Sequence, residues 1–243
     1  MLNDFRTLRV AVLCSKRAPG LDELLHHPNR GKLFDIGCVV TTETSFPDAR
    51  RVEALDVPVL HHPIRPFFDA REASLRHQPT RRDFDSVTAT VLRQLGIDTV
   101  VLLGYLYVLS DAMLTQFFNR IINVHDADLT LADSNGERKY AGLHSTRDAI
   151  VAGEKETRST VHYVTEKVDA GPVLILSGRY PVAPFAHDAA RAGHADVVKA
   201  YAYAHREWMM RDCWGSLVIR ALEYMSAGVD QEDLTEVIRV ASA

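Results

Sequence analysis

Short apolar runs alternate with stretches of helical length through the first two-thirds of this chain, and this alternation strongly limits the folds open to it. Several runs lack polar alternation, which is typical of strands buried on both faces in a parallel sheet. Strands that alternate with helices predict an α/β doubly wound, mostly parallel, Rossmann-like sheet. The expected strands are Leu8–Cys14, Phe34–Thr41, Val57–Leu60, Asp98–Leu103, Ile121–Val124, Thr160–Val164 and Val173–Leu176.

The segments between these strands supply the expected helices. A long helix, or a pair with a bend, is expected over Ala189–Ala227, interrupted near Gly215. Ser145 and Asp148 resemble a capping box. The stretch 62–82 is expected to be a surface connection with a short helix. One domain over 1–243 is the simplest account, with a core at about 8–182 and C-terminal helices at about 188–240. The other expected helices are Leu21–His26, Arg82–Leu95, Asp111–Asn119, Thr146–Ala152 and Gln231–Val240.

Charge, apolar run length and cysteine spacing argue against nucleic-acid-binding, membrane and secreted proteins. A net charge of -4 gives no basic surface for nucleic acid or anionic membranes. The longest apolar run, near Thr99–Leu103, is too short to span a bilayer. The opening segment Met1–Thr7 does not resemble a secretory leader. Cys14, Cys38 and Cys213 are scattered, so no disulfide framework is indicated and a cytoplasmic location is expected.

The turn after the first predicted strand is a candidate anion site. Lys16 and Arg17 lie in this turn, Cys14–Gly20, before a predicted helix. Doubly wound proteins bind anions at such a turn, although the glycine pattern of nucleotide-binding loops is missing here. The two cations are candidates for holding a phosphate or carboxylate. Two solvated surface charges are the equal alternative.

Three further residues are candidates for acyl chemistry. Asn123 and His125 share one face at the carboxyl end of a central strand, where α/β sheets bind ligands. An amide beside an imidazole can polarise a carbonyl and stabilise an oxyanion. Asp169 could charge-pair with His125 or relay a proton. Taken singly, the alternatives are a buried polar residue, a satisfied histidine and a turn aspartate.

Metal binding is not indicated, although the chain holds 11 histidines. The adjacent pairs at positions 26–27 and 61–62 point to different faces. Asp126, Asp128 and Asp133 follow His125 without the spacing of a calcium loop, which indicates a solvated acidic loop. No metal ion is expected.

The order and spacing of these segments resemble the folate-dependent formyltransferases, and within them the glycinamide ribonucleotide formyltransferases of purine synthesis. The resemblance runs from about Leu8 to about Val182. An isolated N-x-H is common by chance, but here G-L-H and V-H-x-V-x-x-x-x-D-x-G-P follow it. The matching segments are Phe34–Thr41, Gly96–Ser110, Ile121–His125, Gly142–His144 and Thr160–Pro172.

The resemblance implies a reaction in which an amine attacks the formyl carbon of the co-substrate 10-formyltetrahydrofolate. Asn123 and protonated His125 would stabilise the oxyanion, and Asp169 would support that charge and help move the amine proton. The implied partners are a small-molecule amine and a reduced folate, without nucleic acid or membrane. The implied folate-binding residues are Leu106, Tyr107, Val108, Leu109, Thr165, Glu166, Lys167 and Val168, and those facing the acceptor are Ser15, Lys16, Arg17, Gly20 and His144.

The departures from the family lie on the acceptor side. After N-x-H the family usually continues H-P-S-L-L-P, whereas 125–130 reads H-D-A-D-L-T, and the loop 131–140 is longer and more polar. Without two φ-fixing prolines this wall should be more flexible or differently shaped. The added carboxylates would repel an anionic acceptor if they faced it. Arg211-Asp212 stands where the purine enzymes tend to place Glu-His.

Several alternatives stay open. A 10-formyltetrahydrofolate hydrolase would use the same trio with water, although that family usually carries an extra domain before the first strand. An amino-sugar formyltransferase and a catalytically silent folate-binding homologue are the others. The C-terminal aromatic and methionine residues form core or, as the alternative, the face of a homodimer; they are Tyr201, Trp208, Met209, Met210 and Trp214.

Overall fold

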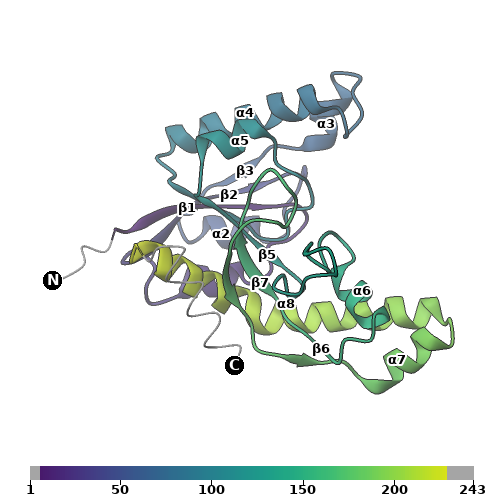
Figure 1. Cartoon of the computed structure of the whole chain (residues 1–243). Coiled ribbons are helices and arrows are strands. Elements are labelled where there is room, and N and C mark those ends of the chain that lie inside the picture. The colour runs from purple at the N-terminus through teal and green to yellow at the C-terminus, as the bar shows by residue number, and fades with distance from the viewer. Residues whose placement is uncertain (1–5, 229–243) are drawn as a thin grey trace.

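A seven-stranded sheet forms the centre of the protein in the computed structural model, which describes residues 6–228. The strand order is β3-β2-β1-β4-β5-β7-β8. Strands β1 to β5 pair in parallel, whereas β7 runs antiparallel to both neighbours. The predicted α/β, mostly parallel sheet is therefore confirmed (Figure 1). The strands are β1 (Leu8–Cys14), β2 (Phe34–Thr41), β3 (Val59–His61), β4 (Thr99–Leu102), β5 (Ile121–His125), β7 (Thr160–Tyr163) and β8 (Val173–Leu176), with β6 (Glu156–Thr157) and β9 (Tyr180–Pro181) in a separate pair.

Helices cover both faces of the sheet, and successive side chains of a strand point to opposite faces. Val10 and Val12 of β1 belong to one apolar cluster, which includes residues of α1 (Leu21–His26) and α8 (Ala195–Ser226). Ala11 and Leu13 belong to the other, with α4 (Gln78–Gln94) and α5 (Asp111–Gln116). Figure 1 shows these two helical layers above and below the sheet. Continuous apolar strands follow directly from this arrangement.

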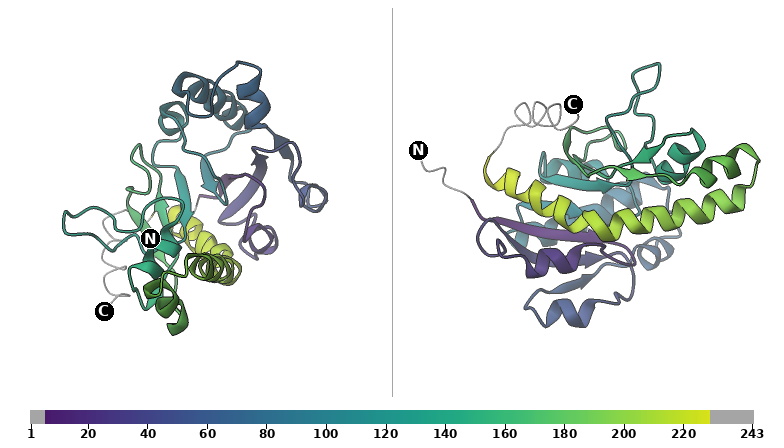
Figure 2. Two further views of the ribbon diagram at one scale, coloured as in Figure 1. Left: turned by 90° about the vertical axis from the view of Figure 1, so that its right-hand side faces the viewer. Right: turned by 90° about the horizontal axis from the view of Figure 1, so that it is seen from below.

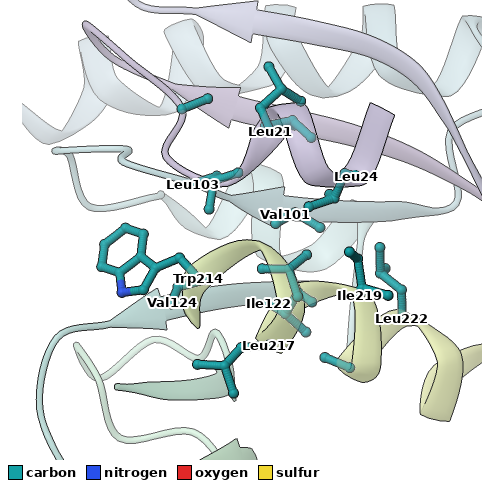
Figure 3. Packing of buried hydrophobic residues seen from close by; sticks show 14 of the residues in the cluster. Leu21, Leu24, Val101, Leu103, Ile122, Val124, Trp214, Leu217, Ile219 and Leu222 are labelled. Carbon is teal, nitrogen blue, oxygen red and sulfur yellow. The ribbon is translucent and has the colours of Figure 1, made fainter. Parts of the chain in front are cut away.

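Helix α8 is one continuous helix of 32 residues that lies along the face of the sheet (Figure 2). Its apolar side chains, among them Trp214 and Leu217, belong to the same buried cluster as Val101 of β4 and Ile122 of β5 (Figure 3). The interruption predicted near Gly215 is wrong. Gly215 instead permits close packing of α8 against α1, because a Cβ atom built on Gly215 would lie only 2.4 Å from the carboxyl carbon of Glu23. The chain bends earlier, at Gly193, between α7 (Pro184–Arg191) and α8.

Three local expectations need correction. Helix α4 begins at Gln78 instead of Arg82, because His77 caps it by accepting a hydrogen bond from the Thr80 amide. The stretch before it is not simply a surface connection, since α3 (Ile64–Asp69) buries two apolar side chains. Ser145 begins α6 (Ser145–Val151) but forms no capping box, because its hydroxyl donates to Asp126.

The remaining short helix, α2 (Ala49–Glu53), was not predicted. The helix expected over Gln231–Val240 lies outside the described residues. Within residues 6–228, no helix is long and apolar enough to cross a membrane.

Candidate active site

A cavity of about 210 Å³ opens at the carboxyl ends of β4 and β5. This is the edge at which parallel α/β sheets bind ligands, beside the point where the strand order reverses between β1 and β4. The walls come from the turn after β4, the end of β5, the loop after β7, the segment before α6, and α8. The lining residues are Leu102, Gly104, Tyr105, Leu106, Tyr107, Val108, Leu109, Asn123, Val124, His125, Asp126, Gly142, Leu143, His162, Val164, Thr165, Val168, Asp169, Arg206 and Trp214.

The sheet register brings Asn123, His125 and His162 to one wall of the cavity. Asn123 and His125 are two residues apart on β5 and therefore share a face. His162 of β7 lies directly opposite Asn123 in the antiparallel pair. The side-chain amide nitrogen of Asn123 is 3.1 Å from His162 Nε2. Regular β geometry is thus sufficient to place these three polar side chains together.

Asp169 reaches the same wall from the loop between β7 and β8. One carboxylate oxygen lies 3.5 Å from His125 Nδ1, and the other lies 3.5 Å from His162 Nε2. The Gly142 amide donates a hydrogen bond of 2.8 Å to the carboxylate. The Asp169 side chain is only 10% exposed, so it is a nearly buried anion between two imidazoles.

The turn that carries Asp169 has an unusual backbone. Asp169 adopts a left-handed φ of 52°, which is uncommon for a residue other than glycine. Arg138 holds this turn by donating hydrogen bonds of 2.5 and 2.6 Å to the carbonyls of Asp169 and Gly171. Gly171 is required by close packing, since a Cβ atom there would lie 1.9 Å from the Tyr163 carbonyl oxygen.

Burial and hydrogen bonding act in opposite directions on the Asp169 carboxyl. Burial alone would raise its pKa. The hydrogen bond from His162, the charge of His125 and the Gly142 amide outweigh burial and lower the pKa to about 2. Asp169 is therefore ionised at neutral pH and favours a positive charge on a neighbouring imidazole.

The two histidines are oriented by backbone carbonyls. His125 Nε2 lies 2.8 Å from the Tyr140 carbonyl oxygen, which can only accept, so Nε2 carries a proton. Its Nδ1 faces Asp169. In the same way His162 Nδ1 donates to the Tyr163 carbonyl at 2.8 Å, so a neutral His162 accepts at Nε2 from the Asn123 amide.

The residues predicted to bind folate fall into two groups. Six of them line the cavity, and two do not. Glu166 lies at a neighbouring surface pocket, and Lys167 pairs with Glu137 outside the cavity. The six in the cavity wall are Leu106, Tyr107, Val108, Leu109, Thr165 and Val168.

None of the five residues predicted to face the acceptor lines this cavity. Ser15 is fully buried, and its hydroxyl accepts hydrogen bonds from Thr42 and from the Leu106 amide. Arg17 forms a bidentate ion pair with Glu207 of α8. Gly20 packs against α8, whereas Lys16 and His144 are exposed to solvent.

The acidic segment after His125 is not uniformly solvated, contrary to expectation. Asp126 is buried, pairs with Arg206 of α8 and accepts from the Ser145 hydroxyl at 2.8 Å. Asp128 accepts from the Thr130 amide at 2.9 Å, and Asp133 turns back on its own exposed loop. Within residues 6–228, no group of three or more acidic, histidine or cysteine side chains is arranged to hold a metal ion.

Three residues of this region were not predicted from the sequence. His162 lies inside the matched segment Thr160–Pro172, and its alternation with Val161 and Tyr163 was the available signal. Arg138 and Arg206 carried no signal, because their contacts join segments 31 and 80 residues apart.

Comparison with known proteins places the chain in a family. The sequence profile described as "Formyl transferase" matches residues 8–192, which is more than half of the chain. The chain belongs to the formyl transferase family. The resemblance seen in the sequence is therefore confirmed, and formyl transfer is the class of reaction of this formyltransferase.

Individual relatives and one solved structure are similar to this formyltransferase. The phosphoribosylglycinamide formyltransferase of Haemophilus influenzae is 27% identical over 177 residues, 72% of this chain and 74% of the relative. The mitochondrial formyltetrahydrofolate deformylase 2 of Arabidopsis thaliana is 29% identical, over 68% of this chain but only 44% of the relative. The crystal structure of glycinamide ribonucleotide transformylase 1 from Symbiobacterium toebii aligns with a TM-score of 0.65 and 25% identity, over 91% and 89% of the two chains.

Proposed function

We propose that this formyltransferase transfers the formyl group of 10-formyltetrahydrofolate to an amine, with Asn123, His125 and Asp169 as catalytic residues. The observation that carries the proposal is the convergence of an amide, an imidazole and an ionised carboxylate on one wall of the cavity. The separation of 3.5 Å between His125 Nδ1 and Asp169 is longer than a normal hydrogen bond. It leaves Nδ1 available to a reacting group.

The side chains divide the steps of formyl transfer between them. The amine attacks the formyl carbon, and the carbonyl oxygen becomes an oxyanion. The second amide proton of Asn123 and protonated Nδ1 of His125 donate to this oxyanion. The ionised carboxylate of Asp169 stabilises the imidazolium and accepts the amine proton through a water. Collapse of the intermediate breaks the bond to the folate nitrogen, which leaves with a proton.

The opposite walls of the cavity suit a flat, partly aromatic donor. Leu106 and Val108 project from the turn after β4, Val168 from the loop after β7, and Leu143 from the segment before α6. All four are more than 45% exposed, which is unusual for large apolar side chains that cluster at one site. Covering them with the pterin ring system would remove this apolar surface from water.

A second candidate is hydrolysis of 10-formyltetrahydrofolate, with water as the acceptor. Two observations favour it: one similar relative is a formyltetrahydrofolate deformylase, and none of the residues predicted to face an amine acceptor lines the cavity. The same trio would serve, because the oxyanion and the proton transfer are alike in both reactions.

The test is release of tetrahydrofolate from 10-formyltetrahydrofolate, with and without glycinamide ribonucleotide and other amines. Release of tetrahydrofolate only when an amine is present supports formyl transfer. Release of tetrahydrofolate in buffer without any amine supports the hydrolase. In either case Asn123→Ala should lower kcat about 10²- to 10³-fold, as loss of an oxyanion donor does elsewhere. Asp169→Asn should lower it similarly, because the imidazolium loses its counter-ion.

The matched controls are Asn135→Ala and Asp133→Asn, in the exposed turn of the loop 131–140, which should leave kcat within about twofold. Full activity in folded Asn123→Ala and Asp169→Asn would remove the proposed mechanism.

The single-domain organisation, the cytoplasmic location and the choice between core and homodimer face for Tyr201 and Trp208 stay predictions.

A further inference from the structure

Most groups of the turn after β1 that could bind an acidic ligand are already engaged in contacts within the protein. The Ser15 hydroxyl already accepts two hydrogen bonds, and both terminal nitrogens of Arg17 donate to Glu207. Pro19 has no amide proton to donate. A Cβ atom on Gly20 would contact the backbone of α8 at Gly215. Lys16 of this turn is exposed but does not line the cavity, so an acidic group bound at the cavity needs another partner.

Arg206 supplies a cation in the cavity wall. It projects from α8 and, among the residues described, no other lysine or arginine lines the cavity. Its Nε donates to Asp126, whereas its two terminal nitrogens have no hydrogen-bond partner within residues 6–228. The side chain is 29% exposed, and its guanidinium carbon lies 5.7 Å from the centre of the Trp214 ring.

Neighbouring residues fix the position of the Arg206 guanidinium and leave its two terminal nitrogens available to a ligand. Asp126 fixes it from the Nε side and is itself held by the Ser145 hydroxyl at 2.8 Å, while the Thr146 hydroxyl donates to the Asp126 carbonyl at 2.8 Å. Asp126 directly follows His125, the last residue of β5. The contacts that hold Arg206 are therefore joined to the end of the strand that carries the proposed catalytic residues. The two terminal amino groups present a planar fork of donors, which matches the oxygens of a carboxylate or phosphate.

We propose that Arg206 binds an acidic group of the amine acceptor, a carboxylate or a phosphate, and thereby selects acidic amines over neutral ones. This inference rests on the proposed function, since it concerns the acceptor of that reaction. Asp126 is the positioning residue that orients Arg206, and its own charge is offset by the ion pair. The acidic segment after His125 thus helps to bind an anionic acceptor instead of repelling it.

The test measures kcat/KM for pairs of amines that differ only in the acidic group. Glycine and glycinamide differ in a carboxylate, whereas glycinamide ribonucleotide and its riboside differ in a phosphate. The pair with the larger preference identifies the source of the acidic group. The protein should favour the acidic member of one pair by at least about tenfold, because a bidentate charge-assisted pair is among the stronger polar contacts.

Two variants then assign that preference to Arg206. Arg206→Met combined with Asp126→Asn removes both charges without leaving one buried and unpaired, and should abolish the preference. Arg206→Lys keeps the charge but loses the fork, and should reduce the preference partially. Lys199→Met removes an exposed cation two turns away on the same helix and should leave the preference unchanged.

Each outcome decides between the two proposals. Formylation of amines without an acidic preference, or with a preference that persists in the double variant, would overturn the role of Arg206 and keep the proposed transfer. Release of tetrahydrofolate in buffer without formylation of any amine would overturn both. Absence of any cleavage would also overturn both and leave a folate-binding protein.

Discussion

Replacing Asp169 by asparagine removes a buried charge while keeping the size of the side chain. In the native protein this carboxylate lies 3.5 Å from each of two imidazole nitrogens, and it accepts a hydrogen bond from the Gly142 amide. Asparagine can still accept from Gly142 but carries no charge. The substitution therefore isolates the electrostatic part of the Asp169 contacts.

The pKa of Asp169 sets the size of this effect. It falls from an ordinary value of 3.8 to about 2 in the folded protein. One pKa unit corresponds to about 1.4 kcal/mol, so ionised Asp169 contributes about 2 kcal/mol to the free energy of unfolding. Because the folded pKa is the lower one, this contribution is fully present above about pH 4. It is lost as the pH falls from about 4 to about 2.

Urea unfolding of both proteins between pH 7 and pH 2.5 measures this contribution. At pH 7 the Asp169→Asn protein should be less stable by about 2 kcal/mol, and the difference should shrink below pH 4. Asp188→Asn, in an exposed ion pair with Arg191, is the control and should change stability by less than about 1 kcal/mol. Parallel stability curves for the native protein and the Asp169→Asn variant at all pH values would refute the reasoning.

Three further perturbations test other parts of the structure. Arg138→Met should lower kcat by about 10- to 100-fold, because the turn that carries Asp169 loses the two hydrogen bonds that hold it. Arg138→Lys should recover part of the lost kcat. A lower Tm with unchanged kcat would contradict this role. His62 stacks on Phe84. Burial of the His62 ring and, to a smaller extent, the charge of Arg71 lower the pKa of His62 to about 4. Since the unfolded chain binds a proton more readily, stability should fall by up to about 3 kcal/mol between pH 6.5 and pH 4, and His62→Gln should flatten this part of the stability curve. Gly171→Ala should reduce stability by at least about 3 kcal/mol, measured by urea unfolding, because its Cβ atom would overlap the Tyr163 carbonyl; an unchanged unfolding midpoint would show that the turn relaxes freely.

The sheet was predictable because its signal is local. Strands β1 and β2 agree with the predicted ranges residue for residue, since burial on both faces requires a largely apolar run. Helix ends were less predictable, because they depend on contacts made elsewhere. Gly215 resembles a helix break in sequence, yet it is needed where α1 approaches α8, and Gly193 makes the real bend.

The candidate site also combines features that a local sequence pattern predicts with features that depend on distant contacts. The period of two residues along a strand is enough to pair Asn123 with His125. The position of His162 requires the register between β5 and β7, which joins residues 39 positions apart. The contacts of Arg206 and Arg138 depend on how α8 and the loop 131–140 meet the sheet, and no local pattern encodes them.

The segment after His125 lacks the two prolines that the resemblance led us to expect, and the structure shows which contacts hold this segment. Thr160 accepts from the Leu129 amide at 3.1 Å and donates to the Ala127 carbonyl at 2.6 Å. Asp126 is tied to α8, and Arg138 ties the following loop to the Asp169 turn. Prolines would restrict φ regardless of the surroundings, whereas these contacts fix the wall only when α8 and the loop 131–140 are in place. The shape of the proposed acceptor side therefore depends on Arg206 and Arg138. Under the proposed function, these two arginines couple acceptor binding to the position of the Asp169 carboxylate.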